Sequence, residues 1–218
     1  GDRNRGRRLG AVGVIMNQAL VAATGLEQGR PRLSLPDRRH PPSIVAARMR
    51  CVYLDLDGTL LGPGASLLRD ADGGFALDGV RALQACWRAD AEVVLYSGRR
   101  QTSVFESARM IGATAYAFEV GCGLVIDGEL EWLTDGVVPS ETDGSIYEQI
   151  ERSGAPALLL EQYAGRLEYH TPWSRGREVS HLFRGLVDLQ EAAALLEGAG
   201  LGWLRLVDNG VVQAAAEQ

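Results

Sequence analysis

Two aspartates stand close together at the end of a short apolar run that begins at Cys51. The run consists of β-forming or bulky apolar residues, which favours a buried strand. Asp55 and Asp57 are two positions apart, so on an extended backbone both side chains point to the same side. Gly58 then permits a sharp turn. Because neighbouring carboxylates repel each other and are costly to bury without a counter-charge, the pair predicts a cation-assisted site with a nucleophile and an acid/base.

A second group of polar residues, Ser97–Arg99, follows the next apolar segment of the chain. Ligands of an open parallel sheet bind at the carboxyl ends of its strands, so this group is expected beside the aspartates. The Ser97 hydroxyl and the free amides at the start of a helix form a suitable anion site. A carboxylate pair next to an anion site predicts phosphoryl transfer, in which one aspartate attacks phosphorus and the other protonates the leaving oxygen.

Other interpretations of these residues stay open at this point. Sugar-nucleotide transferases also carry an acidic D-x-D pair, although that motif would not predict Ser-Gly-Arg after the next strand. Ser97 is also suited to a plain helix N-cap. Arg99 is equally suited to a surface ion pair.

The elements that position these residues alternate between strand and helix from residue 50 onward. We expect a parallel sheet flanked by helices, because alternating strands and helices imply crossover connections. The expected strands are 51–56, 91–96 and 115–119, the expected helices are 76–89 and 101–111, and a hairpin covers 124–126 and 130–133.

A second α/β unit is expected after about Pro139, with helices on one face of a mostly antiparallel sheet. Its expected helices are 146–150, 156–163 and 189–196, and its expected strands are 167–170, 178–183 and 201–207. Asp208–Gly210 predicts a hairpin turn before a short return strand at 211–212.

Residues 1–48 differ from the rest of the chain in charge. They hold nine arginines against three acidic residues, a balance of +6, whereas the whole chain of 218 residues is at −6. One alternative is a secretory leader, with Arg7 and Arg8 before the apolar run 9–23. We favour a disordered or non-native extension ahead of Met49.

Composition limits the classes of function. An apolar fraction of 46% and a charged fraction of 23% are typical of a globular protein. The net negative charge, without a basic stripe interleaved with aromatic residues, argues against nucleic acid as a partner. No apolar run reaches the roughly 18 residues that span a membrane. Three scattered cysteines without a C-x-x-C pair indicate a reducing compartment, and we expect the protein in the cytoplasm.

The two polar groups together resemble a known family. Asp55–Leu60 is similar to the D-x-D-G-T-L first motif of the haloacid dehalogenase-like superfamily, and Ser97–Arg99 resembles its second motif as found in subclass IIB. That subclass includes Cof-type sugar phosphatases and mannosyl-3-phosphoglycerate phosphatase, and the span 50–218 looks most like the latter branch. The resemblance implies an α/β fold, with a Rossmannoid parallel-sheet core over 49–138 and an inserted α/β cap of the C2 type over 139–218.

The resemblance also implies roles for the motif residues. Asp55 would be the nucleophile and a Mg²⁺ ligand, and Asp57 would be the general acid/base with its backbone carbonyl on the metal. The Ser97 hydroxyl and the Gly98 amide would hold the phosphoryl group of a small phosphorylated metabolite. Thr59 would support the first loop.

Further substrate contacts are expected from three other residues. Arg99 would face the substrate beneath the cap. Within the cap, His181 and Arg184 are candidates to meet an anionic group of the substrate. By contrast, Glu119–Gly123 occupies the place where many relatives have an Asn-Gly pair, so no substrate role is expected there.

The chain departs from the family pattern in one respect. The family uses a third-motif lysine and a fourth acidic motif after the cap, whereas all 22 basic residues of this chain are arginine. The chain is therefore expected to be an N-terminal portion of a phosphatase, with an exposed hydrophobic edge on its sheet. The alternative is a catalytically incomplete protein that binds phosphorylated metabolites or regulates. A phosphomutase is a third possibility, but its usual small helical cap does not match 139–218.

Overall fold

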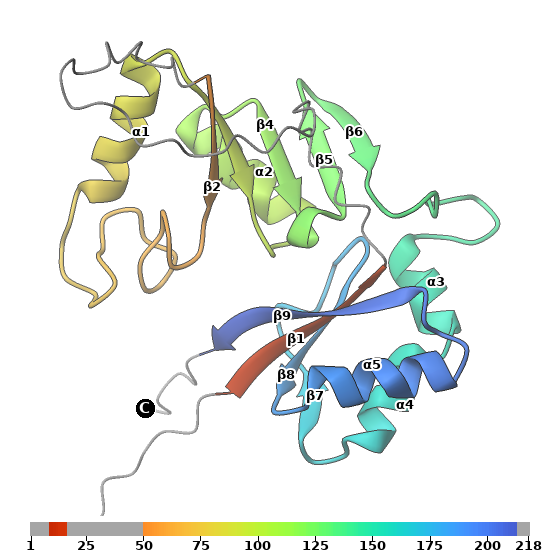
Figure 1. Ribbon diagram of the computed structural model, residues 1–218. Coiled ribbons are helices and arrows are strands. Elements are labelled where there is room, and N and C mark those ends of the chain that lie inside the picture. Colours follow the sequence, from red (N-terminus) through yellow and green to blue (C-terminus); the bar gives the residue numbers. More distant parts are fainter. Residues whose placement is uncertain (1–8, 17–49, 213–218) are drawn as a thin grey trace, which may run out of the picture.

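The computed structural model describes residues 9–16 and 50–212, which form two sheets with helices packed against each (Figure 1). The mixed α/β class predicted from the sequence is confirmed. Within the described residues, no helix is both long and apolar enough to cross a membrane.

The first sheet has five strands in the order β2-β3-β4-β5-β6. The first three are parallel and the last two form an antiparallel hairpin, as the sequence predicts. The strands are β2 (Cys51–Asp55), β3 (Glu92–Tyr96), β4 (Ala115–Phe118), β5 (Gly123–Ile126) and β6 (Glu129–Trp132). The helices between them are α1 (Asp78–Arg88) and α2 (Gln101–Ile111), and a 3-10 turn, η1 (Glu119–Gly121), follows β4.

A shared apolar core holds these helices to the sheet. Val104 and Ala108 lie four residues apart on α2 and are both buried, as the helical repeat requires. They belong to one cluster with Leu83 of α1, Leu95 of β3 and Phe118 of β4. This packing fixes the carboxyl ends of β2, β3 and β4 relative to one another.

Strand β2 is less buried than its sequence predicts. It lies at the edge of the sheet and pairs only with β3 within the part of the chain that the structure describes. Cys51, Tyr53 and Asp55 are exposed, and Tyr53 keeps 73% of its surface open to solvent. A strand with a neighbour on one side leaves apolar side chains uncovered, so the buried strand expected from the sequence is corrected to an exposed edge strand.

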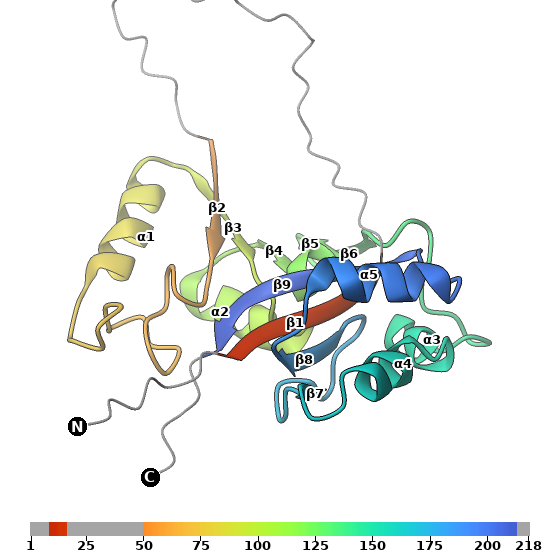
Figure 2. The same cartoon turned by 60° about the horizontal axis from the view of Figure 1, so that its bottom comes forward.

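The second sheet has four strands in the order β7-β8-β1-β9, with every neighbouring pair antiparallel. Figure 2 shows β1 running between β8 and β9. The strands are β1 (Leu9–Met16), β7 (Leu167–Tyr169), β8 (His181–Gly185) and β9 (Leu204–Val212), and the helices are α3 (Ile146–Arg152), α4 (Ala155–Gln162) and α5 (Leu189–Gly198).

All three helices of this unit share one hydrophobic core with the sheet. Its fully buried members include Ile146 and Ile150 of α3, Leu159 of α4, Leu196 of α5 and Phe183 of β8. Helices gathered around a common core with an antiparallel sheet are the arrangement predicted for the segment after Pro139.

Strand β1 corrects the expectation for the N-terminal segment. Leu9–Met16 is not an unstructured extension but an inner strand of the second sheet, with Val12 opposite Phe183 of β8 and Gly13 opposite Val207 of β9. Paired backbone on both sides gives these residues a stable place in the fold. Residues 1–8 and 17–48 lie outside the described part of the chain.

Strand β9 corrects a second expectation. Asp208–Gly210 is not a hairpin turn, because β9 continues through it to Val212 beside β1. A register shift between Gly10 and Val12 of β1 accommodates this stretch. The turn was predicted from local composition, which the long-range pairing with β1 overrides.

Candidate active site

The site is built where β2 and β3 end at the same edge of the first sheet. Asp55 is the last residue of β2 and lies opposite Tyr96, the last residue of β3. The Thr59 hydroxyl donates a hydrogen bond to Asp55 Oδ2 at 3.1 Å. This contact restrains the Asp55 carboxylate. The supporting role of Thr59 in the first loop stays a prediction.

The backbone after β2 doubles back on itself. The Gly58 amide donates to the Leu61 carbonyl at 2.9 Å, and the Leu61 amide donates to the Leu56 carbonyl at 2.8 Å. Gly58 has a φ of +83°, a left-handed conformation that glycine adopts without a steric penalty. The tight turn places Asp57 within reach of Arg99.

Arg99 and Asp57 form a two-pronged ion pair across the site. Arg99 Nε donates to Asp57 Oδ2 at 2.6 Å, and Arg99 NH2 donates to Asp57 Oδ1 at 2.5 Å. The hydrogen bonds to Asp57 raise the pKa of the Arg99 guanidinium, although partial burial opposes this. The structure thus brings together two segments that are 42 residues apart in sequence.

This ion pair bears on the acid/base role expected of Asp57. Both of its oxygens accept hydrogen bonds from the Arg99 guanidinium. A general acid must carry a proton. Arg99 therefore has to release an oxygen of Asp57 before Asp57 can reach a leaving group.

Ser97 shapes the turn after β3 from within. It is buried, and its hydroxyl accepts a hydrogen bond from the Arg99 amide at 3.2 Å. The N-cap position of α2 belongs to Arg100, without a side-chain cap bond, so the alternative of Ser97 as a plain N-cap is not realised. Contact between Ser97 and a phosphoryl group stays a prediction.

Tyr96 connects the end of β3 to the turn after β4. Its hydroxyl donates to the Val120 carbonyl at 2.7 Å. Burial raises the pKa of Tyr96, and the nearby Cys122 and Asp55 add to this rise. A Cβ on Gly121 would come within 3.0 Å of the Tyr96 ring, so glycine is the residue that fits against the ring at this point.

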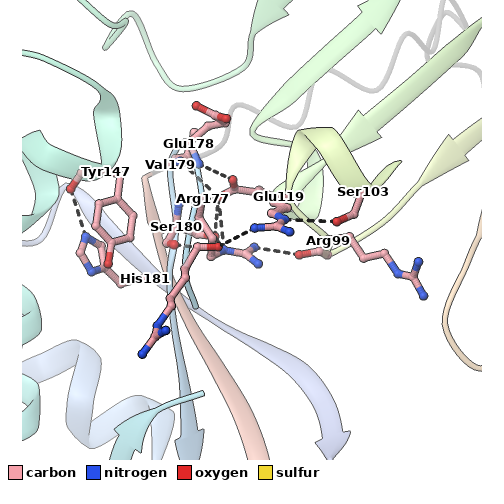
Figure 3. A network of polar contacts seen from close by, with 12 residues as sticks. Arg99, Ser103, Glu119, Tyr147, Arg177, Glu178, Val179, Ser180 and His181 are labelled. Atoms are coloured by element: carbon pink, nitrogen blue, oxygen red, sulfur yellow. Dashed lines mark hydrogen bonds and ion pairs between the residues drawn. The ribbon is translucent and has the colours of Figure 1, made fainter. Parts of the chain in front are cut away.

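Glu119 and Arg177 join the turn of the site to the second unit (Figure 3). The Arg177 guanidinium donates to the Gly98 carbonyl at 2.8 Å and lies 3.5 Å from the Glu119 carboxylate. Sequence reasoning missed both residues, since nothing in a single sequence marks a charged side chain as buried. The position of Glu119 directly after β4 is the one weak indication in the sequence that it lies near the site.

His181 does not lie where the sequence predicts. Its ring is fully buried and stacks on Tyr147, whose carbonyl is 3.0 Å from His181 Nε2. The Tyr169 hydroxyl lies 3.1 Å from Nδ1. Because both ring nitrogens are engaged inside the second unit, we withdraw the expectation that His181 contacts a substrate.

Arg184 is a half-buried residue of β8. Its Nε donates to Glu168 Oε1 at 2.7 Å, and the two residues are cross-strand partners in β8 and β7. A role for Arg184 in binding a substrate stays a prediction.

The oxygen atoms of the aspartate pair suit a hard cation. Mg²⁺ is commonly held by one or two carboxylates, with water and substrate phosphate completing the shell. Within residues 9–16 and 50–212, no group of three or more acidic, histidine or cysteine side chains is placed to hold a metal. The donor type therefore fits Mg²⁺, with Asp55 as the carboxylate that Arg99 does not engage.

A cavity of about 630 Å³ lies in the second unit near the site. Its lining includes Tyr147, Glu151 and Tyr169, together with Arg175 and Arg177. The Arg175 carbonyl accepts a hydrogen bond from the Arg100 side chain at 3.1 Å. One rim of the cavity is therefore attached to the turn that follows β3.

Comparison with known proteins gives only distant similarity. No protein-family model and no curated protein sequence matches the chain. Among solved structures, a haloacid dehalogenase-like hydrolase from B. subtilis is 22% identical, covering 56% of this chain and 36% of that chain, with a TM-score of 0.35.

Two further solved structures are described as phosphatases. One, a phosphatase of the haloalkanoate (HAD) enzyme superfamily from Bacteroides thetaiotaomicron, is 15% identical, with coverages of 74% and 51% and a TM-score of 0.39. The other, a HAD subclass IIB sugar phosphatase, is 16% identical, with coverages of 56% and 40% and a TM-score of 0.35. The present chain spans between 36% and 51% of the length of these three structures.

Proposed function

We propose that this chain carries the nucleophile and acid/base half of a Mg²⁺-dependent phosphatase for small phosphorylated metabolites. The observation that carries the proposal is the contact of Arg99 with Asp57, which places the Asp-x-Asp turn and the Ser-Gly-Arg turn at one edge of the sheet. Two carboxylates and a cationic, amide-rich turn are the groups that phosphoryl transfer needs.

The reaction would proceed in two displacements. A carboxylate oxygen of Asp55 attacks phosphorus, the bond from phosphorus to the leaving oxygen breaks, and Asp57 gives its proton to that oxygen. Asp57 then takes a proton from water as the water oxygen attacks phosphorus. The aspartyl–phosphate bond breaks, inorganic phosphate leaves and Asp55 is regenerated.

Mg²⁺, when bound, would offset the negative charge of the phosphoryl oxygens. The side chain of Asp55 and the backbone carbonyl of Asp57 would hold it. Mg²⁺ usually keeps several waters, so two protein ligands are compatible with binding.

Arg99 would change partners during the cycle. Its planar guanidinium binds two oxygens of a carboxylate or of a phosphoryl group with the same geometry. An incoming phosphoryl group therefore competes with Asp57 for the guanidinium. Transfer of Arg99 to the substrate would free the Asp57 carboxyl to act on the leaving oxygen.

The leaving group would face the second unit, in the position of a cap. The tyrosines and polar side chains of the 630 Å³ cavity support a hydroxyl-rich leaving group, such as that of a sugar phosphate or a mannosyl-3-phosphoglycerate-like ester. Arg184 is a further candidate to meet an anionic group of such a substrate.

Two observations favour a second function. The chain contains no lysine, and within the described residues the aspartate pair has no third acidic partner for a metal. A protein of this kind would bind phosphorylated metabolites, or act as a regulatory protein, without hydrolysing them. Binding of a sugar phosphate, measured by titration calorimetry, without release of phosphate would favour this alternative.

The test of the leading proposal is a phosphatase assay on a panel of sugar phosphates, with and without Mg²⁺. Hydrolysis that needs Mg²⁺ and disappears in Asp55→Asn is expected. Asp78→Asn, which alters an exposed aspartate of α1 paired with Arg81, is the matched control and should keep full activity. Activity that survives Asp55→Asn would exclude the aspartyl-phosphate mechanism.

A further inference from the structure

The carboxylate of Glu119 is buried between the two units of the structure. It has no exposed surface, yet it belongs to the turn η1 that directly follows β4. It accepts hydrogen bonds from the Ser180 amide at 2.6 Å, the Ser180 hydroxyl at 2.7 Å and the Glu178 amide at 2.6 Å (Figure 3). One side chain of the first unit thus binds the backbone that leads into β8.

Arg177, a residue of the second unit, forms a hydrogen bond back to the first unit. Its side chain is only 3% exposed, and its Nε donates to the Ser180 hydroxyl at 2.9 Å and to the Ser180 carbonyl at 3.1 Å. Its NH2 group donates to the Gly98 carbonyl at 2.8 Å. Burial lowers the pKa of Arg177, and the charge of Glu119 opposes this, so the pair offsets the cost of burying either charge alone.

Hydrogen bonds from Arg177 and from the turn after β4 fix the carbonyls of three successive residues. The Ser97 carbonyl accepts from the Val120 amide at 3.0 Å, the Gly98 carbonyl accepts from Arg177, and the Arg99 carbonyl accepts from the Glu119 amide at 2.8 Å. The second unit thus holds the Gly98 carbonyl, whereas the turn after β4 holds the carbonyls of Ser97 and Arg99.

Fixing a carbonyl also fixes the amide that shares its peptide plane. The N–H of a trans peptide points opposite to the C=O, so the amides that follow Ser97, Gly98 and Arg99 take their directions from these three bonds. Each of those amides therefore points away from the partner that holds its carbonyl. Among these amides, that of Arg99 donates to the Ser97 hydroxyl, and that of Gly98 is the one expected to meet an anion.

We propose that Arg177 and Glu119 are positioning residues that couple docking of the second unit to the shape of the Ser97–Arg99 turn. Arg177 supplies the hydrogen bond from the second unit to the Gly98 carbonyl, and Glu119 holds Arg177 in place. The part of this inference that concerns phosphate rests on the proposed function. The coupling between docking of the second unit and the shape of the Ser97–Arg99 turn is independent of the proposed function.

The coupling is tested by amide hydrogen exchange, measured residue by residue by NMR, in Arg177→Lys. A lysine keeps the charge but cannot span Ser180 and Gly98 as a guanidinium fork does. The Ser180 amide reports the second unit, the Arg99 and Val120 amides report the turn, and the Leu95 amide of β3 reports global opening. Arg109→Lys, at an exposed ion pair of α2, is the control.

We expect faster exchange at Ser180, Arg99 and Val120 with Leu95 unchanged, and no change in Arg109→Lys. Acceleration at Ser180 alone, or at none of the three, would overturn the coupling. If Arg177→Lys also accelerates Leu95 by global unfolding, Ser180→Ala decides the matter. That variant removes one acceptor of Arg177 and should accelerate the same turn amides to a smaller extent, whereas unchanged turn amides would contradict the proposal.

The functional part is tested with inorganic phosphate. Loss of a hydrogen bond from a charged donor should weaken phosphate binding by about ten-fold in Arg177→Lys. Coupled amide exchange in a protein that binds no phosphate would refute the proposed function but keep the coupling. Unchanged phosphate affinity together with accelerated turn amides would show that the turn does not bind phosphate.

Discussion

The guanidinium of Arg99 contacts both carboxylate oxygens of Asp57, so the two charged groups expected to act on a substrate are paired with each other. The pair is partly exposed, with a quarter of the Arg99 side chain open to solvent. The same fork of N–H groups can bind two oxygens of a phosphoryl group. The arrangement suits a group that must be released when a phosphoryl group arrives.

Replacing Arg99 by lysine should weaken substrate binding without disturbing the fold. An ammonium group cannot make the two parallel bonds that a guanidinium makes, so we expect KM to rise about ten-fold. Steady-state kinetics with a sugar phosphate measure the change. Arg109→Lys is the control, and an unchanged KM in Arg99→Lys would place Arg99 outside the substrate site.

Asp57→Asn should discriminate between leaving groups. An asparagine cannot protonate the leaving oxygen, so kcat/KM for an alkyl phosphate should fall about 100-fold or more. The fall should be smaller for p-nitrophenyl phosphate, whose leaving group needs little protonation. The parameter kcat/KM is used because it reports the first phosphoryl transfer. Equal losses for both substrates would contradict the acid role of Asp57.

Two glycines with open space around them should respond oppositely to alanine. Gly58 adopts a φ of +83°, so Gly58→Ala should cost about 1–2 kcal/mol of unfolding free energy through backbone strain. Gly198 ends α5 without a left-handed φ, and Gly198→Ala should stabilise by up to about 1 kcal/mol. Urea denaturation measures both. A neutral Gly58→Ala would remove the argument for a strained turn beside Asp57.

The neutral, buried ring of His181 makes the second unit sensitive to acid. Burial lowers the pKa of His181 below its ordinary value of 6.5, and the backbone bond to Tyr147 and the more exposed carboxylate of Glu151 only partly oppose this. The unfolded chain therefore binds a proton near pH 6.5 that the folded chain does not. The stabilising contribution of the ring is complete above pH 6.5 and is lost as the pH falls below it.

The measurement compares wild type with His181→Gln by urea denaturation at about pH 7.5 and about pH 5.5. Wild type should lose more unfolding free energy than the variant over this interval. His170→Gln, at a less buried histidine whose pKa burial also lowers, should remove a smaller part of the pH dependence. The same pH dependence in wild type and His181→Gln would contradict a buried neutral ring.

Much of the first unit could be predicted from the sequence because its decisive signals are local. Helix α2 was expected over 101–111 and is found there, since its apolar repeat and the glycine after it mark both its face and its end. The meeting of Asp57 with Ser97–Arg99 followed from chain order, because successive parallel strands end at one edge.

The features that could not be predicted depend on partners far away in the chain. Strand β1 pairs with β8 and β9, which lie more than 150 residues further on. A local sequence pattern does not predict such distant strand partners. The same holds for Glu119 and Arg177, whose contact spans the two units. Charged residues are usually exposed, so composition alone assigns both to the surface.

Direct detection of the covalent intermediate tests the central claim most closely. The protein is mixed with a phosphorylated substrate and Mg²⁺, quenched and reduced with borohydride, which converts an aspartyl phosphate to homoserine. Mass spectrometry then locates the product in the peptide that carries Asp55. Homoserine at position 55, absent without substrate, is the predicted result. Turnover without homoserine, or homoserine at position 57, would contradict Asp55 as the nucleophile.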